Sequence, residues 1–302
     1  MTDTLAKPQS DSQLRAIWQQ FRTHKGAAFG LAVLSILVFA VLVGPFLWHP
    51  VKLTVVEAIK SKNMGPSFRF PLGTDQIGRD MLVRMIAAGK VSLAVGFVAM
   101  FIAITFGTTI GILAGYYRRL DGPLMRITDM FLALPLIPLL LVMVMLFRDK
   151  VASILGPELG AFLLIVFAIG ITSWMQTARI VRGEVLALKE REYVLAARSI
   201  GTPARRIILR HILPNVISPV MVAATLGIAD AIITESVLSF LGLGFPPDFP
   251  TWGRLLYDGL SYMQLFPERV VWPGLAISLT VLSVNYIGDG LRDALDPRIR
   301  GR

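Results

Sequence analysis

Long apolar runs, separated by polar and mostly basic segments, dominate the chain. A helix that crosses a bilayer needs roughly 20 consecutive apolar residues, and six runs approach or exceed this length. They lie at about 27–48, 91–116, 124–147, 161–177, 216–243 and 272–287. The pattern therefore predicts an all-α polytopic membrane protein with six transmembrane helices.

Two shorter amphipathic patterns flank the first run. One precedes it and predicts an interfacial helix from its apolar face, which consists of Leu14, Ile17, Trp18 and Phe21. The other follows it, and we expect Thr74 or Asp75 to cap an amphipathic helix at the outer surface. That helix would end before the second span begins near residue 91.

Glycine and proline positions give detail within the spans. Gly107, Gly111 and Gly115 lie four residues apart in the second run, which predicts a stripe for close helix packing. Pro135 and Pro138 lie inside the third run, so a kink is expected there. A short outer loop is expected at 148–157, and an outer loop at 245–270 carries Trp252 and Tyr257, residue types that suit a membrane interface.

Composition supports a membrane location. The chain is 54% hydrophobic and 17% charged, against roughly 25% charged residues in soluble domains. Its net charge of +10 would suit nucleic acid, but the basic residues lie between apolar runs. With both termini inside, 19 basic residues lie on the inner side and 11 on the outer side. This bias predicts an N-in and C-in topology, although the first outer loop, with 7 basic residues, opposes it.

The sequence offers little for metal or covalent chemistry. The absence of cysteine excludes disulfides, thiolate metal sites and cysteine nucleophiles. The three histidines, His24, His49 and His211, are far apart, so no metal site is predicted within this chain.

Acidic residues near or within the spans could either form ion pairs that stabilise the fold or take part in function. Asp75 and Arg79 have the spacing of a helix-surface ion pair, which we favour over a catalytic group with Asp80. Asp129, near the inner end of the third run, either pairs with Arg126 or marks a functional contact, and we favour the ion pair.

Asp230 and Glu235 interrupt the fifth run. Ionisable residues within a span usually face a bundle interior or a wet path, so both are candidates for a pathway or gate.

The polar segment 191–214 lies between the fourth and fifth runs. It carries one acid, Glu192, and five arginines, Arg191, Arg198, Arg205, Arg206 and Arg210. Gly201-Thr202-Pro203 predicts a break, because glycine permits a tight turn, threonine can cap, and proline suits the start of a helix. We therefore expect a helix, a sharp turn and a second helix at the membrane surface.

This segment resembles a cytoplasmic loop of permease subunits in binding-protein-dependent ABC importers. The family pattern has Glu-Ala-Ala, then Gly, then Ile-x-Leu-Pro. Ala196-Ala197, Gly201 and Leu213-Pro214 match it at the same spacing, whereas Leu195 replaces the Glu and His211 replaces the Ile. The resemblance implies a coupling helix that seats in a cytoplasmic ATPase. An ordinary basic cytoplasmic loop is the alternative interpretation.

Three further strings resemble the C-type permeases of dipeptide, oligopeptide and nickel importers. They are Leu72-Gly73-Thr74-Asp75 with Gly78-Arg79-Asp80, Glu235 to Gly244, and Gly288 to Pro297. The resemblance implies a type I ABC importer permease fold in a bacterial inner membrane. It also implies a second, different permease subunit, two ATPase subunits and a periplasmic binding protein. ATP and magnesium would bind the ATPases, so no cofactor is expected in this chain.

The predicted organisation has five parts. They are a cytoplasmic tail with an interfacial helix at 1–26, a first span at 27–48, a periplasmic loop with an amphipathic helix at 49–90, a core permease domain at 91–290 that contains the coupling loop 183–214, and a cytoplasmic tail at 291–302. The residues expected to couple to the ATPase are Glu192, Ala196, Ala197, Arg198, Gly201, Arg205, Arg206 and Pro214.

The predicted function is import of dipeptides or oligopeptides, with nickel or another small solute as the alternative cargo. The sequence lacks a Gly-x-x-x-x-Gly-Lys-Ser/Thr phosphate loop, so energy must come from a partner or an ion gradient. An ion-coupled transporter that uses Asp129, Asp230 and Glu235 is therefore a second hypothesis. A membrane-embedded enzyme is the third, but the chain lacks a Gly-x-Ser-x-Gly motif or another catalytic constellation.

Overall fold

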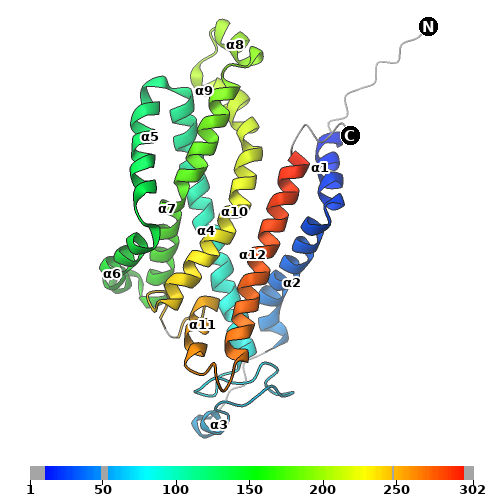
Figure 1. Cartoon of the computed structure of the whole chain (residues 1–302), viewed down its shortest axis with the longest axis vertical. Helices are drawn as coiled ribbons and strands as arrows, with labels where there is room; N and C mark the ends of the chain where they lie inside the picture. Colours follow the sequence, from blue (N-terminus) through cyan, green and yellow to red (C-terminus); the bar gives the residue numbers. More distant parts are fainter. Residues whose placement is uncertain (1–10, 49–53, 247, 296–302) are drawn as a thin grey trace, which may run out of the picture.

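The computed structural model describes residues 11–48, 54–246 and 248–295, which fold into helices joined by short loops (Figure 1). Up to residue 188, the helices are α1 Asp11–Thr23, α2 Lys25–Leu47, α3 Val55–Lys60, α4 Met81–Tyr116, α5 Arg118–Ala133, α6 Leu136–Leu155 and α7 Pro157–Leu188. Beyond residue 188, they are α8 Glu192–Ser199, α9 Ala204–Ile207, a π-helix Ile208–Ile212, α10 Leu213–Phe240, α11 Trp252–Leu260 and α12 Glu268–Leu295. The start of the predicted N-terminal tail, the first residues of the outer loop and the end of the C-terminal tail lie outside the described residues.

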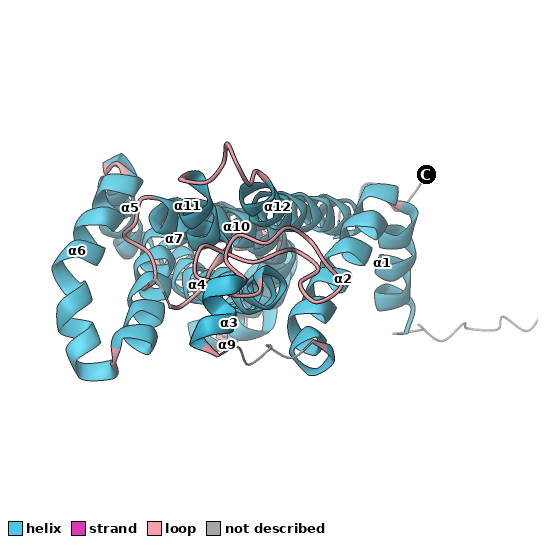
Figure 2. Cartoon of the chain, turned by 90° about the horizontal axis from the view of Figure 1, so that it is seen from below, coloured by secondary structure: helices cyan, strands magenta, loops and turns pink. Residues whose placement is uncertain are grey.

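The long helices form a bundle along the longest axis of the molecule (Figure 1). α2 packs against α12, α12 against α10, α10 against α4, and α4 against α7. Seen along this axis, α6 lies at one flank and α1 and α2 lie at the other (Figure 2). α8, α1 and the last turn of α12 share one end, whereas α3 and α11 lie at the opposite end (Figure 1). This arrangement agrees with the predicted N-in and C-in topology.

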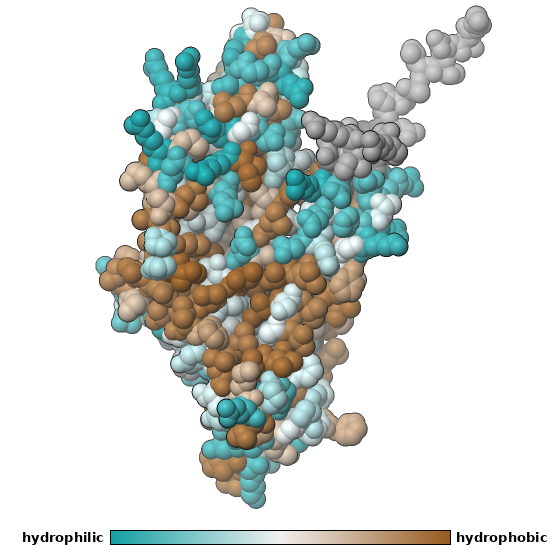
Figure 3. Space-filling model, in the orientation of Figure 1, coloured by the Kyte–Doolittle hydropathy of each residue, from teal (hydrophilic) through white to brown (hydrophobic). Residues whose placement is uncertain are grey.

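Within the described residues, five helical stretches are long and apolar enough to cross a membrane: α2, α4, α7, the continuous stretch Ala204–Phe240 that ends with α10, and α12. α5 and α6 pass the same test together and are bent by 87° at the break between them. Counted as one broken span, this pair brings the total to the predicted six. A hydrophobic band crosses the middle of the molecule, and hydrophilic residues gather toward both ends (Figure 3).

The predicted kink in the third span is in fact a complete break. α5 ends at Ala133, and Leu134 is extended, with φ −76° and ψ 137°. The ring of Pro135 disfavours a helical conformation at the preceding residue, which explains why the helix stops there. Pro138 lies in the first turn of α6, where a missing N–H costs little. The loop expected at 148–157 is also shorter than predicted, because α6 continues to Leu155.

The separate amphipathic helix expected before the second span is also wrong. α4 is one helix of 36 residues that begins at Met81 and runs through the span. Its N-cap is Asp80 rather than Thr74 or Asp75, and the Asp80 carboxylate accepts a hydrogen bond from the amide of Leu82 at 2.8 Å. Asp75 instead organises the preceding loop, where its carboxylate accepts the amide of Arg79 at 2.8 Å.

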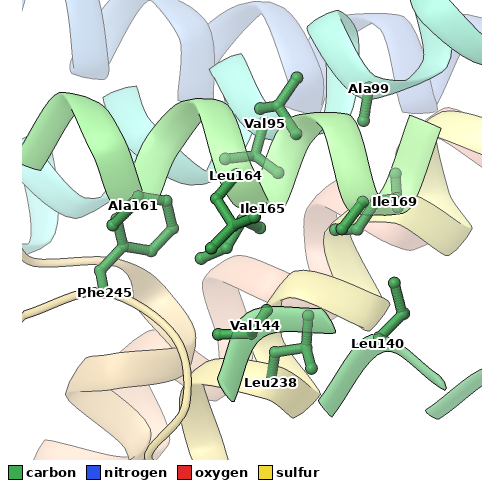
Figure 4. Packing of buried hydrophobic residues seen from close by; sticks show 13 residues of the cluster. Val95, Ala99, Leu140, Val144, Ala161, Leu164, Ile165, Ile169, Leu238 and Phe245 are labelled. Carbon is green, nitrogen blue, oxygen red and sulfur yellow. The ribbon is translucent and has the colours of Figure 1, made fainter. Parts of the chain in front are cut away.

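The glycine stripe packs α4 against α7, as the sequence predicts. A Cβ atom placed on Gly111 would lie 2.7 Å from both the carbonyl oxygen of Ala178 and the Cβ of Val181. Only a residue without a side chain permits this separation of the two backbones. Nearer the outer end, a hydrophobic cluster joins α4, α6, α7 and α10 (Figure 4); it includes Val95, Ala99, Leu140, Val144, Leu164, Ile165, Ile169 and Leu238.

Trp252 does not lie at a membrane interface, in contrast to the sequence prediction. Its side chain is only 2% exposed, and its indole N–H donates to the carbonyl oxygen of Met85 at 3.2 Å. The indole therefore joins α11 to α4 inside the bundle. Tyr257, on the same short helix, is exposed as expected. In α1, Trp18 is also exposed, whereas Phe21 is buried against the end of α12.

Candidate functional site

The segment that contains α8 and α9 projects beyond the bundle at the end shared with α1 (Figure 1). α8 ends in a Schellman motif, in which Thr202 N–H donates to the Ala197 carbonyl at 3.1 Å and Gly201 N–H donates to the Arg198 carbonyl at 3.0 Å. Gly201 has a φ of +78°, which glycine adopts without strain. The predicted helix, turn and helix are therefore confirmed. However, Pro203 occupies the N-cap of α9, and no side chain, including that of Thr202, caps this helix.

Buried apolar side chains attach this segment to the bundle. Val194, Ile207 and Ile212 are buried in one cluster with residues from α4, α7 and α10. The Lys189 ammonium adds a polar link, because it donates to the carbonyl oxygen of Gly115 near the end of α4 at 3.1 Å. A displacement of α8 would therefore be transmitted directly to the ends of α4 and α7.

The outer face of the segment is strongly basic. Arg198, Arg205 and Arg206 are exposed, as are Glu192 and Ala196. The guanidinium of Arg198 lies 5.9 Å from the centre of the Tyr116 ring. Within the described part of the chain, none of the five arginines of 191–214 forms an ion pair. These guanidinium groups are therefore available for carboxylates on another protein.

Two of the predicted coupling residues are less accessible. Ala197 is almost fully buried and faces the cluster that anchors α8. Pro214 is exposed, but it lies in the first turn of α10 rather than in the projecting segment. A π-helix, Ile208–Ile212, separates α9 from α10 and contains His211.

Sequence reasoning missed an apolar tip on the same segment. Ile200 is 83% exposed and Leu195 is 40% exposed, although both are large hydrophobic residues. Ile200 is the C-cap residue of α8, immediately before the Gly201 turn, and this position is the signal that could have revealed it. Large apolar side chains exposed on a projecting element are typical of a contact with another protein.

Two ion pairs join α5 to α7 near the same end of the bundle. Asp129 forms an ion pair, as the sequence favoured, but its partner is Arg179 and not the predicted Arg126. Asp121 forms a two-point ion pair with Arg182, in which the second contact, Nη2 to Oδ2, is 2.7 Å. These ion pairs join residues that are far apart in sequence. The periodicity of a single segment carries no information about such partners.

A cavity of about 470 Å³ opens beside the break between α5 and α6. This volume falls within the roughly 300–1,000 Å³ typical of small-molecule sites. Its lining comes from five helices and comprises Met100, Phe131, Leu132, Leu134, Leu136, Leu139, Thr172, Ser173, Met175, Gln176, Thr177, Ile180, Ala223, Leu226, Gly227, Asp230, Ile233 and Thr234. The lining residues of α7 and α10 lie near the middle of these helices, so the cavity lies at mid-depth in the bundle.

The two acids that the sequence suggested for a pathway or gate lie in different environments. Asp230 lines the cavity and is exposed, and its carboxylate has no partner among the described residues. Glu235 does not line the cavity and is completely buried. Its carboxylate accepts hydrogen bonds from the hydroxyls of Ser92 at 3.1 Å and Ser239 at 2.7 Å. Glu235 therefore joins α10 to α4, whereas Asp230 faces an open space.

Comparison with known families accounts for this architecture. Residues 107–301 match the model of a binding-protein-dependent transport system inner membrane component. This chain belongs to that family. Residues 12–66 of the permease match a second model, the N-terminal TM domain of oligopeptide transport permease C. The first match includes the whole polar segment 191–214 and every helix from α5 to α12, and the second includes α2 and α3.

Curated relatives cover nearly the whole permease. It is 39% identical to the dipeptide transport system permease protein DppC of Alkalihalophilus pseudofirmus, with 96% of this chain and 91% of the relative aligned. It is 37% identical to the oligopeptide transport system permease protein OppC of Haemophilus influenzae, over 95% of this chain and 90% of the relative. It is also 38% identical to the glutathione transport system permease protein GsiD of Pectobacterium atrosepticum, over 96% and 94%.

A solved structure confirms the fold. The permease superposes on a chain of the MetNI methionine ABC transporter, in an inward-facing conformation, with a TM-score of 0.55. The two chains are 19% identical, and the match covers 71% of this chain and 96% of the other. The protein is thus a multi-pass inner membrane permease subunit with the fold of ABC importer permeases, as the sequence resemblance implied.

Proposed function

We propose that this permease moves short peptides into the cell, as one subunit of an ATP-driven importer. The other components would be a second, different permease subunit, two cytoplasmic ATPase subunits and a periplasmic substrate-binding protein. ATP and magnesium would bind the ATPases, and this chain would carry no catalytic residue. The names of the relatives, which refer to dipeptides, oligopeptides and glutathione, support a peptide cargo over nickel or another small solute.

The observation that carries this proposal is the anchored, projecting segment around α8. Its exposed arginines would pair with carboxylates of the ATPase, and Leu195 and Ile200 would enter an apolar cleft beside them. The small side chain of Ala196 would let the two surfaces approach closely. Closure of the ATPases on ATP would then displace α8, and the buried contacts of Val194 and Ile207 would pass the movement to α4 and α7.

The coupling role can be tested with a single introduced cysteine, because the chain contains none. Arg205→Cys would be expressed with the candidate ATPase in intact membranes, and crosslinking measured with and without ATP. We expect a crosslink whose yield depends on nucleotide. Arg119→Cys, exposed near the end of α4 but outside the segment, is the matched control and should crosslink weakly. A cysteine at 205 that fails to crosslink and reacts readily from outside would overturn both the topology and the coupling role.

The cargo can be tested in proteoliposomes that contain the complete transporter and its binding protein. We expect ATP-dependent uptake of dialanine that persists when ionophores collapse the proton and sodium gradients. Uptake of nickel without uptake of dialanine would overturn the peptide assignment. Uptake that needs an ion gradient and survives without the ATPases would instead establish the ion-coupled hypothesis.

A further inference from the structure

An isolated carboxylate lies in the cavity beside the break between α5 and α6, at mid-depth in the bundle. Asp230 is the only charged residue among the lining residues, and it has no cationic partner in the described chain. Ionisable residues within spans are costly and usually face a wet path or a partner. We propose that the cavity receives the protonated amino group of the transported peptide and that Asp230 is its counter-ion. This inference rests on the proposed peptide cargo.

The hydroxyl groups of the lining support a ligand that donates hydrogen bonds. Thr172 Oγ1 donates to the carbonyl of Ala168 at 2.8 Å, and Ser173 Oγ donates to that of Ile169 at 2.7 Å. On α10, Thr234 Oγ1 donates to the carbonyl of Asp230 itself at 2.7 Å. The hydrogens of these three hydroxyls are therefore used within their own helices, and their oxygen lone pairs remain able to accept. Thr177, the fourth hydroxyl of the lining, can both donate and accept.

Acceptors consequently predominate among the polar atoms of the cavity. The carboxylate of Asp230 accepts only, and the amide of Gln176 contributes one carbonyl oxygen beside the two N–H donors of its NH2 group. An ammonium group has three donors and no acceptor, so it complements this lining better than a carboxylate or a phosphate would. The many apolar residues of the lining, such as Phe131 and Ile233, suit the side chains that follow the amino group.

A lysine or arginine of the second permease subunit is the competing cation. Such a side chain would neutralise Asp230, but it would fill only part of a cavity of 470 Å³. A peptide supplies both the cation and the remaining volume, which is why the observations favour a peptide. The experiment below separates these two occupants.

The first measurement probes the charge of the cavity. Leu226 lines the cavity one helical turn before Asp230, so Leu226→Cys places a single thiol there. The complete transporter, with partners free of reactive cysteines, is reconstituted without nucleotide. The thiol is then modified with a cationic or an anionic methanethiosulfonate, and the ratio of the two rates is compared with that for a free thiol in solution.

We expect the cationic reagent to be favoured, and Asp230→Asn to lower the cationic-to-anionic ratio about tenfold. Asp230→Glu should restore the ratio. Glu158→Gln removes the same charge about 21 Å away along α7, counted from Glu158 to Thr172, and should leave the ratio unchanged. A ratio that does not change in Asp230→Asn would overturn the inference. A second outcome would also overturn the inference: no preference between the reagents when Asp230 is present, and a preference for the anionic reagent in Asp230→Asn. That result would mean that a cation of the partner subunit already neutralises Asp230.

The second measurement asks which ligand protects the thiol. Dialanine should slow modification of Leu226→Cys, whereas N-acetyl-dialanine, which lacks the ammonium group, should not. If dialanine is transported but gives no protection, the amino-group site is wrong and the proposed function stands. A different result would be that ethylammonium protects the thiol, whereas dialanine neither protects it nor is transported. Asp230 would then be a cation site, and both the amino-group inference and the proposed peptide cargo would be wrong.

Discussion

Arg84 of α4 and Asp258 of α11 form an ion pair, with 3.3 Å between Nη2 and Oδ2, although 174 positions separate them in the chain. Arg84 also donates to Asp75 at 3.1 Å, and Asp75 accepts a second guanidinium from Arg79 at 2.7 Å. The predicted pairing of Asp75 with Arg79 is thus confirmed, but its location on a helix surface is wrong. The pair lies in the loop before α4, and the Asp75 side chain is 2% exposed.

Removal of Arg84 should therefore destabilise the outer end of the permease. Arg84→Met would leave Asp75 with one partner fewer and Asp258 paired only with Arg254. Breaking a buried ion pair costs about 3–5 kcal/mol when the remaining charge is left unpaired. The loss here should be smaller, because each aspartate keeps one arginine partner. We expect a clearly lower melting temperature of the purified transporter. Lys90→Met, an exposed change on the same helix, is the control, and an equal shift for both variants would contradict this account.

The contact between α4 and α7 should not tolerate a side chain on the glycine stripe. Gly111→Ala places a methyl group 2.7 Å from a carbonyl oxygen, and overpacking of this kind costs roughly 1–3 kcal/mol. The free energy of unfolding in mixed micelles should fall accordingly. Gly122→Ala on α5 meets no atom within 4 Å, so it should not destabilise the protein and should gain up to about 1 kcal/mol from the higher helix propensity of alanine. Equal stability of the two variants would mean that the helices can separate without penalty.

The turn after α8 should require glycine for conformational rather than steric reasons. A Cβ atom on Gly201 would meet no atom within 4 Å, but its φ of +78° is unfavourable for a β-branched residue. Gly201→Val should cost about 1–2 kcal/mol locally and misplace α8. We expect normal assembly with reduced stimulation of ATP hydrolysis by substrate and binding protein. Gly122→Val, on the helical backbone of α5, is the control. Undiminished uptake by the Gly201 variant would show that transport does not depend on the conformation of this turn.

If the polar segment 191–214 couples to an ATPase, as proposed, its basic face should determine binding of that partner. Reversing Arg205 and Arg206 to Glu should reduce co-purification of the ATPase, because two exposed donors become acceptors facing its carboxylates. The same double reversal at Arg118 and Arg119, also exposed at this end, controls for a general loss of positive charge. If both double variants retained the ATPase equally well, the docking surface would lie elsewhere.

Features encoded locally were predictable from the sequence. The apolar runs located every span, because the length of such a run directly reflects the thickness of a membrane. Gly201 revealed the turn of the coupling segment, since a positive φ strongly favours glycine. Gly111 and its two neighbours revealed a close contact, although the sequence did not identify α7 as the partner.

Features that depend on distant residues were not predictable. Thr74, Asp75 and Asp80 are all residue types that can serve as N-caps. In the folded loop the Asp75 carboxylate binds Arg84, and Asp80 is therefore the residue that caps α4. Asp129 has an arginine three residues away in sequence, yet it forms its ion pair with Arg179 on another helix. Periodicity also cannot distinguish an apolar residue that packs inside from one at a projecting tip, which is why Ile200 was missed.

The unbroken length of α4 has a mechanical consequence. Its 36 residues contain no proline, whereas α2, α10 and α12 each contain one inside the helix. At 1.5 Å per residue it is a rod of about 54 Å, longer than the roughly 30 Å hydrocarbon core. One end of the rod holds the Arg84 cluster. At the other end, the Gly115 carbonyl accepts from Lys189 at the end of α7, and Ile112 lies in the buried cluster that contains Val194 of α8. A force applied by a binding protein outside and a force applied by an ATPase inside would therefore act on opposite ends of the same continuous helix.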